Sequence, residues 1–143
     1  MVRNKAASYA VLAMVEIAKK KPPEATGDLQ AGDIATRFEL PMAYTAKVLS
    51  QLARAALLRS DRGPHGGFQL ARPANEISLF EIFHAVGAWA NGDLRLGHTA
   101  PPEVQRSVAE AVQRASARAR EVLEETRLSD LLGEVPVSVG GAR

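Results

Sequence analysis

Apolar residues near the start of the chain recur at the spacing of an amphipathic helix. Ala10, Met14 and Ile17 fall on one side of such a helix, and the pair of prolines at 22–23 interrupts the pattern. Because proline cannot continue a helix interior, this pattern predicts a helix over residues 4–20 that buries one apolar stripe.

Two further helical patterns follow, separated by a short turn at residues 39–40. Residues 32–38 predict a short helix, and residues 41–55 predict a longer one with Pro41 in its first turn, where the missing N–H is tolerated. Residues three and four apart share a face of a helix. The longer helix is therefore expected to bury Thr45, Val48, Leu49 and Leu52 and to carry Tyr44, Lys47, Gln51 and Arg54 on its other face.

The next pattern is that of a β-hairpin with a basic, glycine-rich tip. Residues 57–60 lead in, and residues 68–70 lead out with alternating polarity. Between them, three glycines permit positive φ, Pro64 stiffens the turn and Arg62 supplies positive charge. Helix, turn, helix and a basic two-stranded ribbon is the order of a winged helix-turn-helix, which predicts double-stranded DNA as the partner.

A capping box opens the next predicted helix. Ser78 is followed three residues later by Glu81, and both side chains can satisfy free N–H groups at a helix start. This helix is expected to run to about Val86 and to stop at Gly87. Residues 88–100 then form a linker.

The last third of the chain carries a longer helical repeat of apolar residues. It predicts a helix over about residues 101–126, roughly 39 Å long, which is more than a domain of this size needs for its own core. We interpret it as a dimerisation helix that packs against a second copy; the alternative is that it packs back on its own domain. Its predicted dimerisation stripe consists of Val104, Val108, Ala111, Ala115, Ala119 and Val122.

The predicted fold class is therefore mainly α with a small β-hairpin. A winged helix-turn-helix domain is expected over residues 1–87, and a linker or sensor loop over 88–100. The dimerisation helix and a short C-terminal helix occupy 101–132, where Leu128, Leu131 and Leu132 are expected to tuck back. Residues 133–143 are expected to form a flexible tail.

Charge is divided unevenly along the chain, whose net charge is +2. Residues 1–75 hold 11 Lys or Arg and 6 Asp or Glu, whereas residues 76–143 hold 7 and 10. A basic half that also carries the helix-turn-helix pattern is typical of attraction to phosphate, although chance surface charge gives the same division.

Composition excludes several classes of function. The chain has no cysteine, which excludes disulfides and thiolate metal sites. Aromatic residues make up 5%, too few for a stacked single-strand-binding surface. No apolar run approaches the roughly 20 residues that span a bilayer, so we expect a cytoplasmic protein without a membrane partner.

The quoted segments resemble the IscR/NsrR-type (BadM-type) family of winged-helix transcription regulators. The resemblance is strongest over the wing, residues 62–73, and over Glu76-Ile77-Ser78-Leu79 at the next helix. Tyr9-Ala10 with Met14, Asp33-Ile34-Ala35, and Tyr44 with Leu49 and Leu52 also match. The resemblance covers residues 1–87 well and the long helix in outline.

The resemblance implies a homodimer on a palindromic operator, in which the helix predicted over residues 41–55 enters the major groove and the wing arginine enters the minor groove. Many members sense their signal through an iron–sulfur cluster held by three cysteines in the loop that corresponds to residues 88–100. This chain has no such cysteines, so no cysteine-bound cluster or other cofactor is expected. It resembles members that respond to another effector ligand or to a partner protein.

The candidate DNA-binding residues lie on the helix predicted over residues 41–55, on the wing and at the N-terminus. Cluster-sensing relatives carry serine and glutamate at the positions of Ala43 and Ala46, so a different operator sequence is expected here. The candidates are Arg3, Lys5, Tyr44, Lys47, Gln51, Arg59, Arg62, Gly63, His65 and Gly66, with Arg72 as a further phosphate neighbour.

The linker holds two further residues of interest. Trp89 is interpreted as an anchor between the linker and the long helix, with a ligand-sensing role as the alternative. His98 is the linker's only histidine, and a metal site needs more ligands, so no metal is expected.

Two other classes of function were weighed. A protein–protein adaptor would keep the winged-helix scaffold without binding DNA. An enzyme is not expected, because the three histidines are far apart in sequence and no phosphate-binding loop or paired carboxylates stand out.

Overall fold

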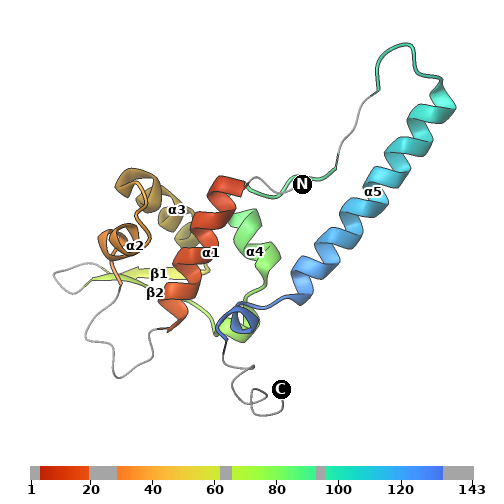
Figure 1. Cartoon of the computed structure of the whole chain (residues 1–143). Coiled ribbons are helices and arrows are strands. Elements are labelled where there is room, and N and C mark those ends of the chain that lie inside the picture. Colours follow the sequence, from red (N-terminus) through yellow and green to blue (C-terminus); the bar gives the residue numbers. More distant parts are fainter. Residues whose placement is uncertain (1–3, 20–28, 62–65, 93–95, 134–143) are drawn as a thin grey trace.

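The computed structural model describes residues 4–19, 29–61, 66–92 and 96–133 of the chain (Figure 1). The described part is mainly helical with one antiparallel hairpin, as predicted. None of its helices is long and apolar enough to cross a membrane. In chain order the elements are α1 (Asn4–Lys19), α2 (Ala31–Arg37), α3 (Met42–Arg54), β1 (Leu58–Asp61), β2 (Gly67–Leu70), the 3-10 helix η1 (Ala74–Glu76), α4 (Leu79–Ala85), α5 (Pro102–Glu125) and the 3-10 helix η2 (Leu128–Leu131).

Helix α1 stands at the centre of the N-terminal domain, between α3 and α4 (Figure 1). Its predicted stripe of Ala10, Met14 and Ile17 is buried in the core. Burial of each large apolar side chain contributes about 1.5–3 kcal/mol. On the side of α2, the Glu16 carboxylate lies 3.0 Å from the Arg37 guanidinium and ties the two helices together.

The helix-turn-helix forms as the sequence predicts. All four positions expected inside α3 are buried: Thr45, Val48, Leu49 and Leu52. Pro41 differs from the prediction, because it caps α3 instead of lying in its first turn and has extended backbone angles. Its carbonyl accepts hydrogen bonds from the Thr45 N–H and hydroxyl, at 3.0 and 2.9 Å.

The hairpin pairs β1 with β2 from Leu58 opposite Leu70 to Asp61 opposite Gly67. The Phe68 N–H also donates to the Leu29 carbonyl at 2.7 Å, which adds a third extended segment to the ribbon. The predicted tip, residues 62–65, lies outside the described residues.

The predicted capping box of α4 is present. Ser78 Oγ accepts from the Glu81 N–H at 3.1 Å, and the Glu81 carboxylate accepts from the Ser78 N–H at 2.9 Å. Gly87 follows the helix with φ of 67°, a left-handed conformation that glycine adopts without a Cβ penalty.

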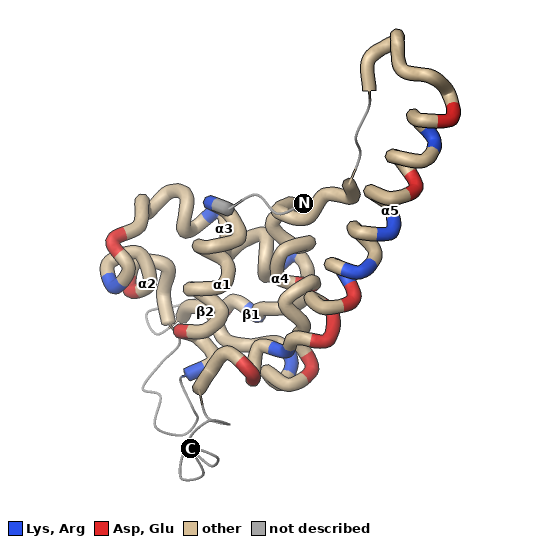
Figure 2. The backbone as a smooth tube through the Cα atoms, turned by 45° about the vertical axis from the view of Figure 1, so that its right-hand side comes forward, with Lys and Arg blue, Asp and Glu red and all other residues tan. Residues whose placement is uncertain are grey.

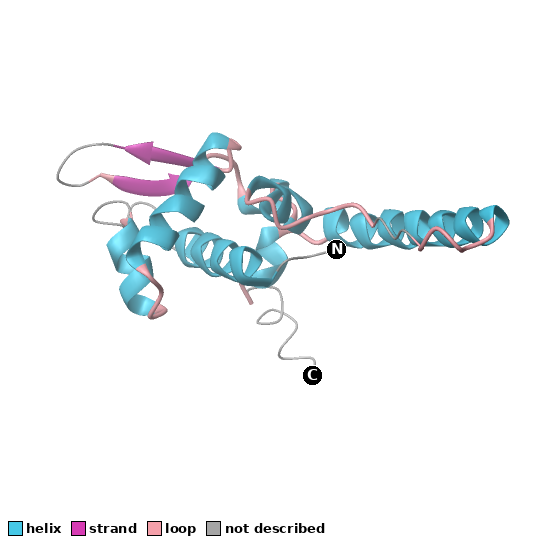
Figure 3. Ribbon diagram, turned by 90° about the horizontal axis from the view of Figure 1, so that it is seen from above, coloured by secondary structure: helices cyan, strands magenta, loops and turns pink. Residues whose placement is uncertain are grey.

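Helix α5 projects away from the domain (Figures 1 and 3). Its 24 residues span about 36 Å at 1.5 Å per residue. At its C-terminal end the chain returns to the domain, because the Leu79 N–H donates to the Thr126 carbonyl and the Leu128 N–H donates to the Ile77 carbonyl, both at 2.8 Å. Leu128 is fully buried as expected, whereas Leu131 stays 36% exposed and does not tuck back.

Candidate nucleic-acid interface

Helix α3 presents a polar face on the side opposite its buried residues. The exposed residues at its centre are Ala43, Lys47, Ser50 and Arg54, which we call the reading face. The spacing of these four positions is i, i+4, i+7 and i+11, so they form one row along the helix. Sequence reasoning missed Ser50, although this spacing, counted from Ala43, would have found it.

Tyr44 and Gln51 lie at the edge of this face and not at its centre, because both are half-buried. The Tyr44 ring meets the Tyr9 ring edge-on, with centroids 5.0 Å apart. Lys5 Nζ lies 5.3 Å from the centroid of the same ring, within cation–π range. The first turns of α1 and α3 are thus joined, and the structure brings two predicted site residues, Lys5 and Tyr44, together.

Met42 is a candidate contact that sequence reasoning missed. It opens α3 and its side chain is 52% exposed, although methionine is usually buried. Its signal in the sequence was its position as the first residue after Pro41, on the outer side of the helix start.

The described parts of the wing place one predicted residue on the surface. Arg59 is exposed on β1, opposite Gln69. Gln69 in turn donates to the Asp61 carboxylate at 2.7 Å, which fixes the strand ends next to the tip. Gly66 is buried and offers no open surface of its own. The predicted residues Arg3, Arg62, Gly63 and His65 lie outside the described part of the chain.

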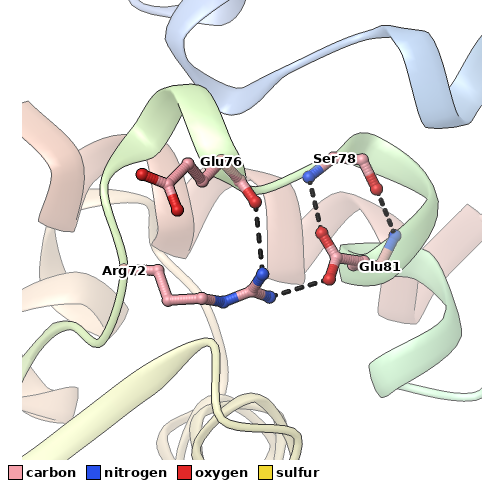
Figure 4. Close-up of polar contacts among 4 residues, drawn as sticks. All are labelled: Arg72, Glu76, Ser78 and Glu81. Atoms are coloured by element: carbon pink, nitrogen blue, oxygen red, sulfur yellow. Dashed lines mark hydrogen bonds and ion pairs between the residues drawn. The ribbon is translucent and has the colours of Figure 1, made fainter.

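Arg72, predicted as a phosphate neighbour, has a structural role within the chain. Its guanidinium donates to the Glu81 carboxylate at 2.8 Å and to the Glu76 carbonyl at 3.2 Å (Figure 4). Because Glu81 also completes the capping box with Ser78, this network joins the exit of the wing to the start of α4.

The network also controls the charge of Glu81. Partial burial acts to raise the pKa of this carboxyl, but the hydrogen bond from the Ser78 N–H and the adjacent Arg72 guanidinium outweigh burial. The pKa of Glu81 therefore lies below its usual value, and the carboxylate stays charged at neutral pH.

Charges on the two parts of the molecule differ in arrangement (Figure 2). Helix α3 carries Lys47 and Arg54 and no acidic residue, whereas α5 carries both acidic and basic residues along its length. A surface of one sign attracts phosphate, and a mixed surface does not.

The predicted apolar stripe of α5 lies open to solvent over most of its length. Val104 is 46% exposed and Val122 is 61% exposed, and Ala111 and Ala115 are exposed between them. Val108 and Ala119 are half-buried at the edge of the stripe. The alternative that this stripe packs back on its own domain therefore does not describe the chain.

A neighbouring face of α5 does pack within the chain, which sequence reasoning missed. Ser116 is buried there, and Val112 is half-buried one turn before it. Gly92 of the linker lies against this face, next to Val112 and Ser116. A serine amid charged residues carries no apolar signal, so the sequence pattern could not reveal this contact.

An aromatic cluster lies where the linker, α4 and α5 meet. The Trp89 ring meets Phe80 edge-on at 5.7 Å, His84 stacks on Phe80 at 5.5 Å, and the Arg120 guanidinium lies 4.3 Å from the centre of the Phe80 ring. Trp89 therefore anchors the linker to α4, whereas the prediction had it contact the long helix. His98 is exposed, and the described residues contain no cluster of three or more His, Asp or Glu suited to a metal ion.

Comparison with known proteins gives one consistent match. Residues 3–134 match the Rrf2 family, described as iron-dependent transcriptional regulators. The chain is 32% identical over 131 residues to the HTH-type transcriptional regulator IscR of Cereibacter sphaeroides, an alignment that covers 87% of this chain and 82% of that protein.

Solved structures show the same similarity in three dimensions. CymR, the global cysteine regulator of B. subtilis, has a TM-score of 0.74 at 25% identity, with 93% of this chain and 97% of CymR covered. CymR of Staphylococcus aureus has a TM-score of 0.68 at 29% identity, with 90% and 96% covered. The likeness therefore extends over the long helix as well as the winged-helix domain.

Proposed function

The chain belongs to the Rrf2 family of helix-turn-helix transcription regulators, and we propose that it acts in the cytoplasm as a homodimeric repressor of a palindromic operator. In this proposal α3 enters the major groove and the wing around Arg62 enters the minor groove. The observation that carries it is the reading face of α3, which is basic, free of acidic side chains and supported by four buried residues on the opposite side.

The residues around this face support DNA contact of two kinds. Lys47, Arg54 and the Lys5–Tyr44 pair offer charge and hydrogen-bond donors to phosphates, which position a protein on a duplex. Met42 and Ala43 offer exposed methyl groups at the N-terminal end of the helix, where base edges are usually contacted. Apolar side chains there favour the thymine methyl group over a hydrogen-bonded base.

The open apolar stripe of α5 supports the homodimer. An amphipathic helix is stable when its apolar side is covered, and Gly92 of the linker lies against a different face. A second copy related by a two-fold axis would cover the same stripe on both chains and present two reading faces to two half-sites. Repression follows most simply, because a dimer that occupies a promoter blocks access without a further contact surface.

The signal is proposed to act at the junction of the linker, α4 and α5. The indole N–H of Trp89 is buried there and has no hydrogen-bond partner among the described residues. A ligand or partner protein that supplies an acceptor would bind one arrangement of this junction better than another. The family's iron dependence does not carry over through a cysteine-bound cluster, because the chain has no cysteine.

Selection from a pool of random duplexes, followed by fluorescence anisotropy, tests the function. The selected DNA should contain paired, inverted half-sites, and its affinity should fall as salt rises because phosphate contacts release counterions. Arg62→Ala should remove the preference for the selected duplex over a scrambled one. If no duplex is enriched, or if both duplexes bind equally, DNA recognition is wrong and the adaptor hypothesis takes its place.

Trp89→Phe tests the proposed signal, because phenylalanine keeps the ring but has no N–H. The affinity of the wild type for the selected duplex should change on addition of a small-molecule or protein fraction of a cell extract, and that of the variant should not. An equal response of both proteins would contradict a role for this junction.

A further inference from the structure

The linker is fastened to α5 through the backbone of two residues, Gly92 and Leu96. The Gly92 N–H donates to the buried Ser116 hydroxyl at 3.1 Å, and the Gly92 carbonyl accepts from the Gln113 side chain at 3.2 Å. Nearer the start of α5, the Leu96 N–H donates to the Gln105 side chain at 3.2 Å. We call the Gly92–Gln113–Ser116 contact the latch.

The latch requires glycine at position 92. A Cβ placed there would lie 2.6 Å from Val112 Cγ1 and 3.3 Å from the Val112 carbonyl oxygen. Val112 cannot easily turn aside, because a valine in a helix strongly prefers one χ1 rotamer. Gly97, in the same linker, has nothing within 4 Å of the corresponding position. The close approach is therefore specific to Gly92.

The latch completes the attachment of α5 to the winged-helix domain. The C-terminal end of α5 is fixed by the Leu79–Thr126 hydrogen bond and by Arg120 over the Phe80 ring. The latch holds the helix about three turns before Thr126, and the linker that carries it is anchored to α4 by Trp89. A rod fixed at two separate points has a defined direction, whereas a rod fixed at one end can swing.

We propose that Gly92 and Ser116 are positioning residues for DNA recognition, which set the half-site spacing that the dimer accepts. This inference rests on the proposed function as a homodimer on paired half-sites. Each α5 joins its own reading face to the dimer contact, so the angle of α5 against its domain determines the separation and relative rotation of the two reading faces. The latch keeps that angle at one value.

DNA geometry makes such an angle a source of specificity. One added base pair moves a half-site by about 3.4 Å along the axis and rotates it by roughly 35°, since a turn takes about 10.5 base pairs. A dimer with rigid arms cannot follow both changes. A dimer with loosened arms can, and it should bind neighbouring spacings with more similar affinity.

The test uses duplexes in which the selected half-sites are separated by the selected spacing or by one or two base pairs more or fewer. The wild type should prefer one spacing on the order of tenfold, the loss expected when one half-site is out of register. Gly92→Ala should flatten or move this preference while the affinity for a single half-site and the dimer mass stay unchanged. Gly97→Ala, the matched control, should behave as the wild type.

Three more variants keep the test independent of folding. Ser116→Ala removes the latch acceptor without adding volume and should also flatten the preference, whereas Ser107→Ala, at an exposed position of α5, should not. Val112→Ala combined with Gly92→Ala makes room for the added Cβ and should restore the preference. Trp89 is the only tryptophan, so its emission should change in Gly92→Ala and not in Gly97→Ala.

The outcomes separate this inference from the function on which it rests. A wild type that selects no paired half-sites defeats the proposed function, and the spacing role falls with it. A wild type with a clear spacing preference that Gly92→Ala and Ser116→Ala both leave intact overturns the latch alone. Loss of single-half-site binding in a folded Gly92→Ala protein would likewise contradict a role limited to spacing.

Discussion

Ala56 lies directly after α3 with φ of 62°, in the left-handed region that favours glycine. Its N–H donates to the Ala53 carbonyl, and the Leu57 N–H donates to the Leu52 carbonyl, both at 3.0 Å. This pair of bonds is the Schellman motif. The same motif ends α4 at Gly87 and α2 at Glu39, where φ is 54°. At the residue scale, two of three such positions therefore carry a side chain where glycine fits better.

Ala56→Gly is expected to stabilise the fold. It relieves left-handed strain of about 1–3 kcal/mol, against about 0.4–1 kcal/mol from greater freedom of the unfolded chain. The free energy of unfolding in urea should rise by about 1 kcal/mol. Ala55→Gly is the control, because φ there is −83° and only the unfolded-state effect remains, so stability should fall. Destabilisation of similar size in both variants would show that Ala56 is not strained.

Glu81→Gln is expected to destabilise the fold in a pH-dependent way. The pKa of Glu81 is lowered in the folded state. The carboxylate therefore contributes to folding stability above the unfolded pKa of 4.5, and this contribution is lost as the pH falls through the folded pKa. The difference between the urea midpoints of wild type and variant should be largest near neutral pH and should shrink below pH 4.5.

Glu76→Gln is the control for this experiment. The Arg72 guanidinium donates to the backbone carbonyl of Glu76 and not to the Glu76 carboxylate (Figure 4). Its variant should show little change at any pH. A pH-independent loss in Glu81→Gln would mean that packing, and not charge, explains the role of Glu81.

At the scale of the element, α3 divides its two functions between two sides. Its buried side fixes the helix in the core, and its exposed side is free to carry residues chosen for DNA. A substitution on the exposed side should therefore change binding without changing stability.

Lys47→Ala is expected to weaken binding to the selected duplex. It should also reduce the slope of log affinity against log salt concentration by about 1, the loss expected for one phosphate contact. Unfolding midpoints should match the wild type. Arg106→Ala is the control, because it removes the same charge from an exposed position on α5. An equal loss of affinity in both variants would indicate non-specific electrostatic attraction to DNA. Unchanged affinity in Lys47→Ala would exclude Lys47 from the interface.

At the scale of the whole molecule, α5 is the one described helix that extends away from the core (Figure 3). Its open stripe and its linker-covered face are neighbours on the same helix. The first is proposed to hold the second copy, and the second holds the helix to its own domain.

Ala115→Glu is expected to separate the dimer. The substitution places a charge at the centre of the stripe, where desolvation should weaken association on the order of 100-fold or more. Light scattering after size exclusion should show twice the chain mass of 15.3 kDa for the wild type and the mass of one chain for the variant. Ala117→Glu places the same charge on the far side of α5 and should remain dimeric. A dimeric Ala115→Glu protein would contradict the proposed interface.

The sequence by itself determined the order of the elements, the buried side of α3, the capping box at Ser78 and the stop at Gly87. These features depend on residues a few positions apart, whose spacing is fixed by helix and strand geometry. The exposure of Lys47 and Arg59, two of the candidate DNA-binding residues, followed from the same spacing.

Only the tertiary structure decided which distant residues meet. It joined Lys5 to Tyr44, paired Arg72 with Glu81, and placed Gly92 against Val112 and Ser116. Such contacts depend on how whole elements pack and leave no periodic trace in the chain. A glycine that avoids a clash and a serine that accepts one backbone hydrogen bond look like ordinary loop and helix residues until the folded chain brings them within 3.1 Å.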